Sequence, residues 1–151
     1  MQTLADLILD YKQAGKALGH FNISDSNQLH AIAKAAHETK LPVVVGLSEG
    51  EREFFPLREV RALMHMYQKE GIAMYLNADH TYSYEKAVEA IDAGVDSRIN
   101  RFNRFSIPTR MKKRLKRLMG RNSRLLKTHS CWSALLRTQS ISVAFGGRTH
   151  S

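Results

Sequence analysis

Asp79 and His80 stand side by side, directly after the apolar run at residues 72–77. A carboxylate can transfer a proton, and an imidazole can bind a divalent metal through one ring nitrogen. Such a pair also suits a simpler role, because these side chains often cap helices or form hydrogen bonds in loops. The positions of the surrounding helices and strands must therefore decide whether Asp79 and His80 have a chemical or a structural role.

Two further polar residues follow apolar runs. Asn22 lies at the end of a predicted short strand over residues 17–23, and Ser48 ends a Val-rich run over residues 42–48. Both have simpler interpretations, since Asn after a strand is commonly a turn former and Ser48 could cap its own loop.

Helices alternate with these three strands. One helix carries Leu4 to Tyr11, with Thr3 as its cap, and ends near Gly15. A second is capped by Ser24 or Ser26, a third begins at Pro56 after a polar loop over residues 49–53, and Ser83 caps a fourth that ends at Gly94.

This alternation predicts an α/β fold with a parallel sheet. Because right-handed crossovers put all strand ends at one edge, Asn22, Ser48, Asp79 and His80 should meet at the carboxyl edge of the sheet. Ligands and catalytic groups of α/β folds lie at that edge.

The charge divides the chain into two unlike segments. Residues 1–97 hold all 14 acidic residues and 9 Lys or Arg, whereas residues 98–151 hold 14 Lys or Arg and no acid. The two net charges are therefore −5 and +14, which together give the overall +9. We expect two segments, 1–97 and 98–151, the second being a basic tail outside the fold.

Within the tail, residues 109–120 predict a helix with an apolar stripe among Lys and Arg, and residues 121–151 predict disorder. A shifted reading frame or a misjoined gene segment, starting near residue 98, is our hypothesis for its origin. The single cysteine, Cys131, excludes an internal disulfide and is compatible with the cytosol. Without a long apolar run or an export signal, we expect a soluble, cytoplasmic chain with no membrane span.

Four motifs occur in an order and spacing that resemble a known family. They begin at Gly19 (GHFNI), Pro42 (PVVVGLSEG), Leu76 (LNADH) and Glu85 (EKAVEAIDAGVDS). Residues 1–97 resemble the amino-terminal part of class II, zinc-dependent fructose-bisphosphate and tagatose-bisphosphate aldolases. The resemblance implies part of a TIM (β/α)8 barrel, with about three to four βα units, and reversible aldol cleavage of a phosphorylated ketose.

The resemblance also implies roles for single residues. Asp79 would be the catalytic acid/base at the C4 oxygen and His80 a ligand of the catalytic zinc, while Asn22 and Ser48 would contact the substrate. Family members are commonly dimers or tetramers, so a homo-oligomer is possible.

The pattern of the family stops after residue 97. Residues 98–104 replace the expected apolar strand, and neither His129 nor His150 has the setting of the later zinc ligands. A catalytic zinc site normally needs three protein ligands, and one is identified, so we expect this chain to be incomplete and inactive alone.

The other histidines have simpler interpretations. His30, His37 and His65 suit surface positions on helices, and His20 stays unassigned.

The competing hypothesis is a nucleic-acid or anionic-membrane binding module at residues 101–127. A run of charge more often has no specific partner, so this function is less favoured than the aldolase, and nucleic acid is not an expected partner.

Overall fold

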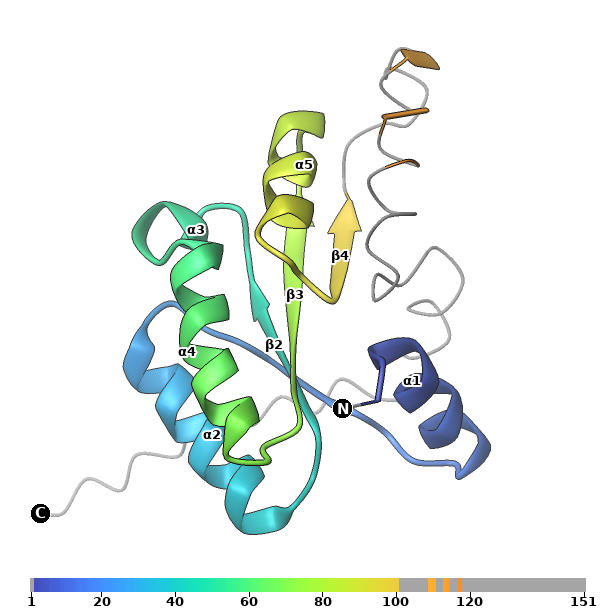
Figure 1. Cartoon of the computed structure of the whole chain (residues 1–151), viewed down its shortest axis with the longest axis vertical. Helices are drawn as coiled ribbons and strands as arrows, with labels where there is room; N and C mark the ends of the chain where they lie inside the picture. The colour runs from blue at the N-terminus through green and yellow to red at the C-terminus, as the bar shows by residue number, and fades with distance from the viewer. Residues whose placement is uncertain (1, 101–108, 111–112, 115–116, 118–151) are drawn as a thin grey trace, which may run out of the picture.

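The chain is described by a computed structural model over residues 2–100, 109–110, 113–114 and 117 (Figure 1). Its elements are α1 (Leu4–Gln13), β1 (Gly19–Asn22), α2 (Ser26–Thr39), β2 (Val43–Leu47), α3 (Glu51–Phe54), α4 (Leu57–Lys69), β3 (Met74–Thr81), α5 (Tyr84–Asp92) and β4 (Ser97–Asn100). The expected disorder at residues 121–151 and Cys131 lie outside the described residues. The tail residues that are described, such as Arg110 and Lys113, are helical and exposed.

The strands form a four-stranded sheet in the order β1-β2-β3-β4, and every neighbouring pair is parallel. The predicted α/β fold with a parallel sheet is therefore confirmed. Because every neighbouring pair is parallel, the carboxyl ends of all four strands lie at one edge of the sheet, as expected.

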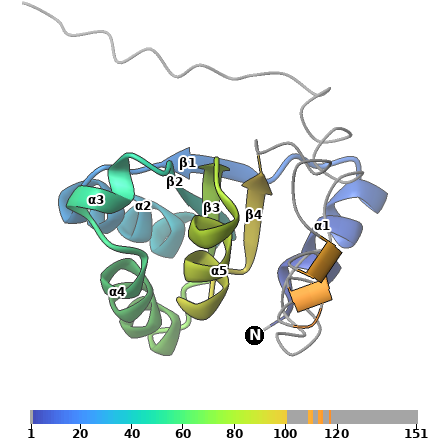
Figure 2. The same cartoon turned by 90° about the horizontal axis from the view of Figure 1, so that it is seen from above.

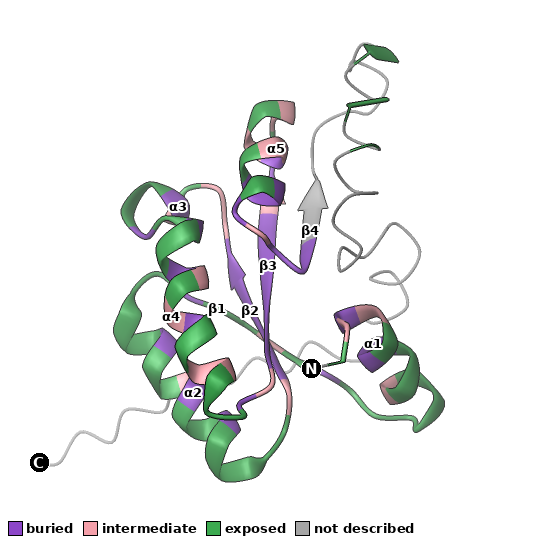
Figure 3. Cartoon of the chain, in the orientation of Figure 1, coloured by how far each residue is buried: buried purple, intermediate pink, exposed green. Residues whose placement is uncertain are grey.

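Helices cover both faces of the sheet, but unequally (Figure 2). The larger core joins α2, α4 and α5 to alternate residues of β2 and β3, such as Val45 and Leu76. On the opposite face, α1 packs through Leu4, Leu7 and Ile8 against Val44 and Tyr75. Covered on both sides, β2 and β3 are buried along almost their whole length (Figure 3), which explains their continuous apolar sequence.

Three side chains cap helices. The Thr3 hydroxyl accepts from Asp6 N–H at 3.2 Å, and the Ser83 hydroxyl accepts from Lys86 N–H at 3.1 Å, as predicted. The cap of α2 was predicted wrongly. It is Asp25, whose carboxylate accepts from Gln28 N–H at 2.9 Å, because Asp25 is the last extended residue before the helix.

Other boundaries also differ from the sequence expectation. The predicted loop at residues 49–53 contains the short helix α3, which starts directly after Gly50. Strand β3 runs to Thr81, so Asp79 and His80 belong to the strand rather than following it. Strand β4 pairs with β3 as far as Asn100, three residues beyond the boundary that we expected at residue 97.

A partly buried ion pair ties α4 to the residue that precedes β4. Arg61 Nη1 donates to Asp96 Oδ2 at 3.0 Å, and the same carboxylate oxygen accepts from Leu76 N–H at 2.9 Å. Asp96 is 4% exposed, so its carboxylate is fully used inside the fold. This acid supports the sheet and is not available for chemistry. Among the described residues, no helix is long and apolar enough to cross a membrane.

Candidate functional site

Polar side chains lie together near the carboxyl edge of the sheet, on the face that α1 covers. The strand register puts Asn22, Gly46, Asn77 and Ser97 in one row across the four strands. Because side chains alternate along a strand, Asp79 points to the same face one step further on. The side of this face nearer the amino edge is covered by α1, so only the carboxyl edge presents polar groups.

Asp79 is the centre of this group. Its Oδ2 accepts from Asn22 Nδ2 at 3.1 Å and lies 3.4 Å from His80 Nε2, while its Oδ1 accepts from the His80 backbone N–H at 2.9 Å. Asp79 is 4% exposed. Three of the four predicted site residues, Asn22, Asp79 and His80, are thus brought together.

The contact between Asn22 and Asp79 spans β2, which separates their strands. Gly46 of β2 makes this possible, because a Cβ there would lie 2.2 Å from Asn22 Oδ1 and 2.5 Å from His20 Nε2. The missing side chain leaves the space in which Asn22 and His20 lie. Gly46 therefore forms the floor of the site.

His80 has an unusual backbone, with a φ of +45° that few residues other than glycine adopt. Its side chain is 34% exposed. The Nδ1 atom is buried and has no hydrogen-bond partner among the described residues. A buried ring nitrogen without a partner is unfavourable unless a ligand or water completes it.

His20, which the sequence left unassigned, lies below Asp79. Its Nε2 is 3.3 Å from Asn77 Nδ2, and Asn77 Oδ1 accepts from the Ser97 hydroxyl at 2.8 Å. Burial lowers the pKa of His20, Asp79 opposes that shift and His80 adds to it. His20 is thus favoured in its neutral form, and a row of three hydrogen-bonded side chains supports the site from underneath.

Arg52 of α3 is a buried cation beside the pair. Its Nε and Nη2 donate to Leu47 O at 3.2 and 3.1 Å, and Nη2 also donates to Asp79 O at 2.7 Å and Thr81 Oγ1 at 3.0 Å. Burial lowers its pKa, although nearby carboxylates, first Glu49, oppose that shift. Arg52 ties the carboxyl ends of β2 and β3 together.

Ser48 directly follows β2, whose last residue, Leu47, pairs with Ala78 of β3. The Ser48 hydroxyl accepts from Glu51 N–H at 3.4 Å, a loop contact of the kind that the sequence left open. Its role in substrate contact stays a prediction.

The described residues suit one metal ligand and do not complete a site. The unpartnered ring nitrogen of His80 fits a ligand of zinc, for which imidazole is a usual donor. Within the described part of the chain, no group of three or more His, Cys, Asp or Glu side chains could hold a metal ion. His30, His37 and His65 are exposed on helices, as predicted, and do not contribute.

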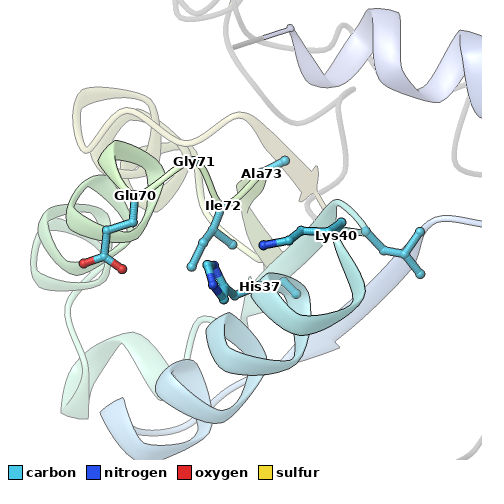
Figure 4. A pocket seen from close by; sticks show the side chains of 8 residues that line it. His37, Lys40, Glu70, Gly71, Ile72 and Ala73 are labelled. Carbon is cyan, nitrogen blue, oxygen red and sulfur yellow. The ribbon is translucent and has the colours of Figure 1, made fainter.

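A small cavity of about 120 Å³ lies at the other end of the sheet. His37, Lys40, Glu70 and Ile72 are among its lining residues (Figure 4). Ile72 comes just before β3, so this cavity is at the amino edge, away from Asp79 at the far end of the same strand. It is not part of the candidate site.

Sequence reasoning missed Arg52, Asn77 and Gly46 as parts of the site. Asn77 had a usable signal, since an amide inside an otherwise apolar strand needs a buried partner. Arg52 sits in a charged stretch that reads as an ordinary solvated loop, and only its burial distinguishes it.

The carboxylate–imidazole pair lies at the carboxyl edge of a parallel α/β sheet, the edge at which such folds bind their ligands. The family model for class-II fructose-bisphosphate aldolase matches residues 2–100, and the chain belongs to this family. The resemblance in the four motifs is thereby confirmed.

Two curated relatives illustrate the extent of the likeness. A fructose-bisphosphate aldolase of Staphylococcus aureus (strain Mu50) is 34% identical over 100 residues, and a probable fructose-bisphosphate aldolase of Bacillus subtilis (strain 168) is 33% identical over 100 residues. Each match covers 63% of this chain and 35% of the relative. The chain thus spans about a third of the length of these curated relatives.

Two solved structures share the fold. The YdjI aldolase of Escherichia coli K12 superposes with a TM-score of 0.65 at 22% identity, covering 82% of this chain and 49% of that one. A putative fructose-1,6-biphosphate aldolase of Coccidioides immitis gives a TM-score of 0.56 at 16% identity, with 80% and 42% covered.

Proposed function

We propose that residues 2–100 are the amino-terminal part of a (β/α)8 barrel and carry part of a class II aldolase active site. The reaction is the reversible aldol cleavage of fructose 1,6-bisphosphate or tagatose 1,6-bisphosphate to dihydroxyacetone phosphate and glyceraldehyde 3-phosphate. The observation that supports this most strongly is the cluster around Asp79, in which both carboxylate oxygens are oriented by Asn22 and His80.

Asp79 is the proposed acid/base. Cleavage between C3 and C4 requires that the C4 hydroxyl lose its proton, and a carboxylate is a suitable acceptor. The hydrogen bonds from Asn22 Nδ2 and His80 N–H hold the carboxylate in one orientation at the carboxyl edge. In the reverse direction the same group returns the proton to the C4 oxygen.

His80 is the proposed zinc ligand. Bound zinc would supply Lewis-acid chemistry at the carbonyl oxygen of the ketose. The unpartnered Nδ1 of His80 is the proposed donor nitrogen, and further ligands must come from outside the described residues. We therefore propose a partial site, which binds zinc weakly and does not turn over substrate in this chain alone.

Asn22 and Ser48 are the proposed contacts to the phosphorylated substrate. Asn22 is an exposed residue, and its Nδ2 bonds Asp79, so it lies beside the proposed acid/base. The homo-oligomer and the cytoplasmic location stay predictions. So does the binding of nucleic acid or membranes by residues 101–127, most of which lie outside the described residues.

The test uses the purified 151-residue chain. Zinc is titrated into a sample labelled with ¹⁵N-histidine, and cleavage of fructose 1,6-bisphosphate is assayed in parallel. Asp79→Ala is compared with Asp92→Ala, an exposed aspartate of α5 that has no place in the site.

We expect zinc to shift the His80 ring signals without measurable cleavage. Cleavage that needs zinc and survives in Asp92→Ala but not in Asp79→Ala would support the aldolase function and refute the incompleteness of the site. A folded chain whose His80 signals do not respond to zinc would overturn the metal assignment.

A further inference from the structure

Arg52 is the most unusual charged group in the described structure. It is 6% exposed, yet among the described residues it forms no ion pair with a carboxylate. Its Nη1 is buried and has no hydrogen-bond partner within the described part of the chain. Glu49, Glu89 and Asp79 act on this charge only from beyond ion-pair distance. Burying a charge without a directly bonded carboxylate is unfavourable, so Arg52 needs a reason for its position.

The other two nitrogens of Arg52 bond only to neutral oxygens. They bridge the last carbonyl of β2, at Leu47, to Asp79 O and the Thr81 hydroxyl near the end of β3. The shortest of these hydrogen bonds, at 2.7 Å, goes to Asp79 O. The positive charge is therefore directed at the backbone that carries the candidate acid/base.

The peptide group between Asp79 and His80 is held from both sides. Its carbonyl oxygen accepts from Arg52 Nη2, and its N–H donates to the Asp79 carboxylate at 2.9 Å. This peptide orientation accompanies the left-handed φ of +45° at His80. Because that conformation is intrinsically unfavourable for a residue with a Cβ, external contacts must maintain it.

We propose that Arg52 is a positioning residue that fixes the Asp79–His80 peptide and thereby aims the Asp79 carboxylate and the His80 imidazole. This inference rests on the proposed aldolase site, because Asp79 and His80 are its acid/base and its metal ligand. Arg52 acts through these two residues and touches no substrate. Its fork of donors suits the task, since one planar group reaches two carbonyls and a hydroxyl at once.

The alternative is that the Arg52 hydrogen bonds only hold β2 and β3 together. In that case its loss would lower stability in general and leave the local geometry of His80 as it is in any folded molecule. Arg61 provides the matched control, since it is also a partly buried arginine that ties elements together, through Asp96, but it lies away from the pair.

The experiment compares Arg52→Met, Arg52→Lys and Arg61→Met in the full chain by NMR. Three quantities are measured for His80: amide hydrogen exchange, the intraresidue HN–Hα cross-peak that is strong in left-handed residues, and zinc affinity from the ¹⁵N ring signals. Thermal unfolding of each variant reports general stability.

We expect both Arg52 variants to lose the left-handed signature and the amide protection of His80, and zinc affinity to fall about 10- to 100-fold, the usual effect of removing a group that orients a ligand. Lys preserves the charge, so Arg52→Lys tests the proposal if Arg52→Met does not fold. Arg61→Met should lower the unfolding temperature and leave His80 unchanged.

Two results would overturn the proposal: unchanged His80 signals in a folded Arg52 variant, or equal losses in Arg61→Met. If zinc leaves wild-type His80 unaffected, the proposed function fails instead, and hydrogen exchange and the HN–Hα signal still decide the role of Arg52.

Discussion

Replacing Gly46 with alanine should damage the site without any backbone strain. Gly46 has no positive φ, so an alanine is compatible with its backbone. The new Cβ, however, would lie 2.2 Å from Asn22 Oδ1 and 2.5 Å from His20 Nε2, whereas an ordinary contact starts at 3.4 Å. The shortfalls are 1.2 Å and 0.9 Å, from 3.4 − 2.2 and 3.4 − 2.5.

Neither neighbour can give way cheaply. Asn22 is held by Asp79 on the far side of Gly46, and His20 is held by Asn77. A shift of about 1 Å breaks a hydrogen bond of 3.1 Å, so the contact between Asn22 and Asp79 should be lost. We expect Gly46→Ala to reduce the free energy of unfolding by about 1–3 kcal/mol, as overpacking usually does.

The assay is urea unfolding, combined with NMR of the Asn22 side-chain amide. Gly50→Ala is the control, because Gly50 has a helical backbone with φ −66° and a Cβ there meets nothing within 4 Å. That substitution should be neutral or stabilise by about 0.4–1 kcal/mol, through the unfolded state. If Gly46→Ala matches the wild type in both stability and the Asn22 signals, the account of Gly46 as the floor of the site is wrong.

Two further predictions concern buried charge. Burial lowers the pKa of His20 below its usual 6.5, so the unfolded chain binds more protons than the folded chain between the two values. The free energy of unfolding should therefore be highest above pH 6.5 and fall as the pH drops from 6.5 to the pKa of folded His20. In urea titrations at several pH values, a His20→Gln variant should show a weaker pH dependence. Parallel curves of unfolding free energy against pH for the two proteins would contradict this prediction. Separately, Asp96→Ala should destabilise the fold by about 3 kcal/mol, because it leaves the partly buried Arg61 without a counterion and Leu76 N–H without an acceptor. The change is measured by thermal unfolding. A loss below about 1 kcal/mol, the scale of a surface ion pair, would show that solvent replaces the carboxylate.

Local sequence was sufficient to predict most of the fold. The Val-rich run of β2 predicted a strand buried on both faces, and helical spacing predicted α1 through Leu4, Leu7 and Ile8. Both signals are local, because they depend on periodicity and on capping side chains within a few residues. Where two caps compete over a few positions, as at Asp25, the backbone conformation decides, and the sequence was ambiguous.

The sequence alone also predicted Asp79 and His80 as a site pair, since the pair follows an apolar run within a recognisable series of motifs. Only the tertiary structure decided how they are held. The hydrogen bond from Asn22 crosses β2 above Gly46, and the Arg52 guanidinium reaches Asp79 from a helix 27 residues earlier in the chain. These contacts join residues that are distant in sequence, so no local pattern encodes them. They depend on the register of the strands and on which polar side chains become buried when the chain folds.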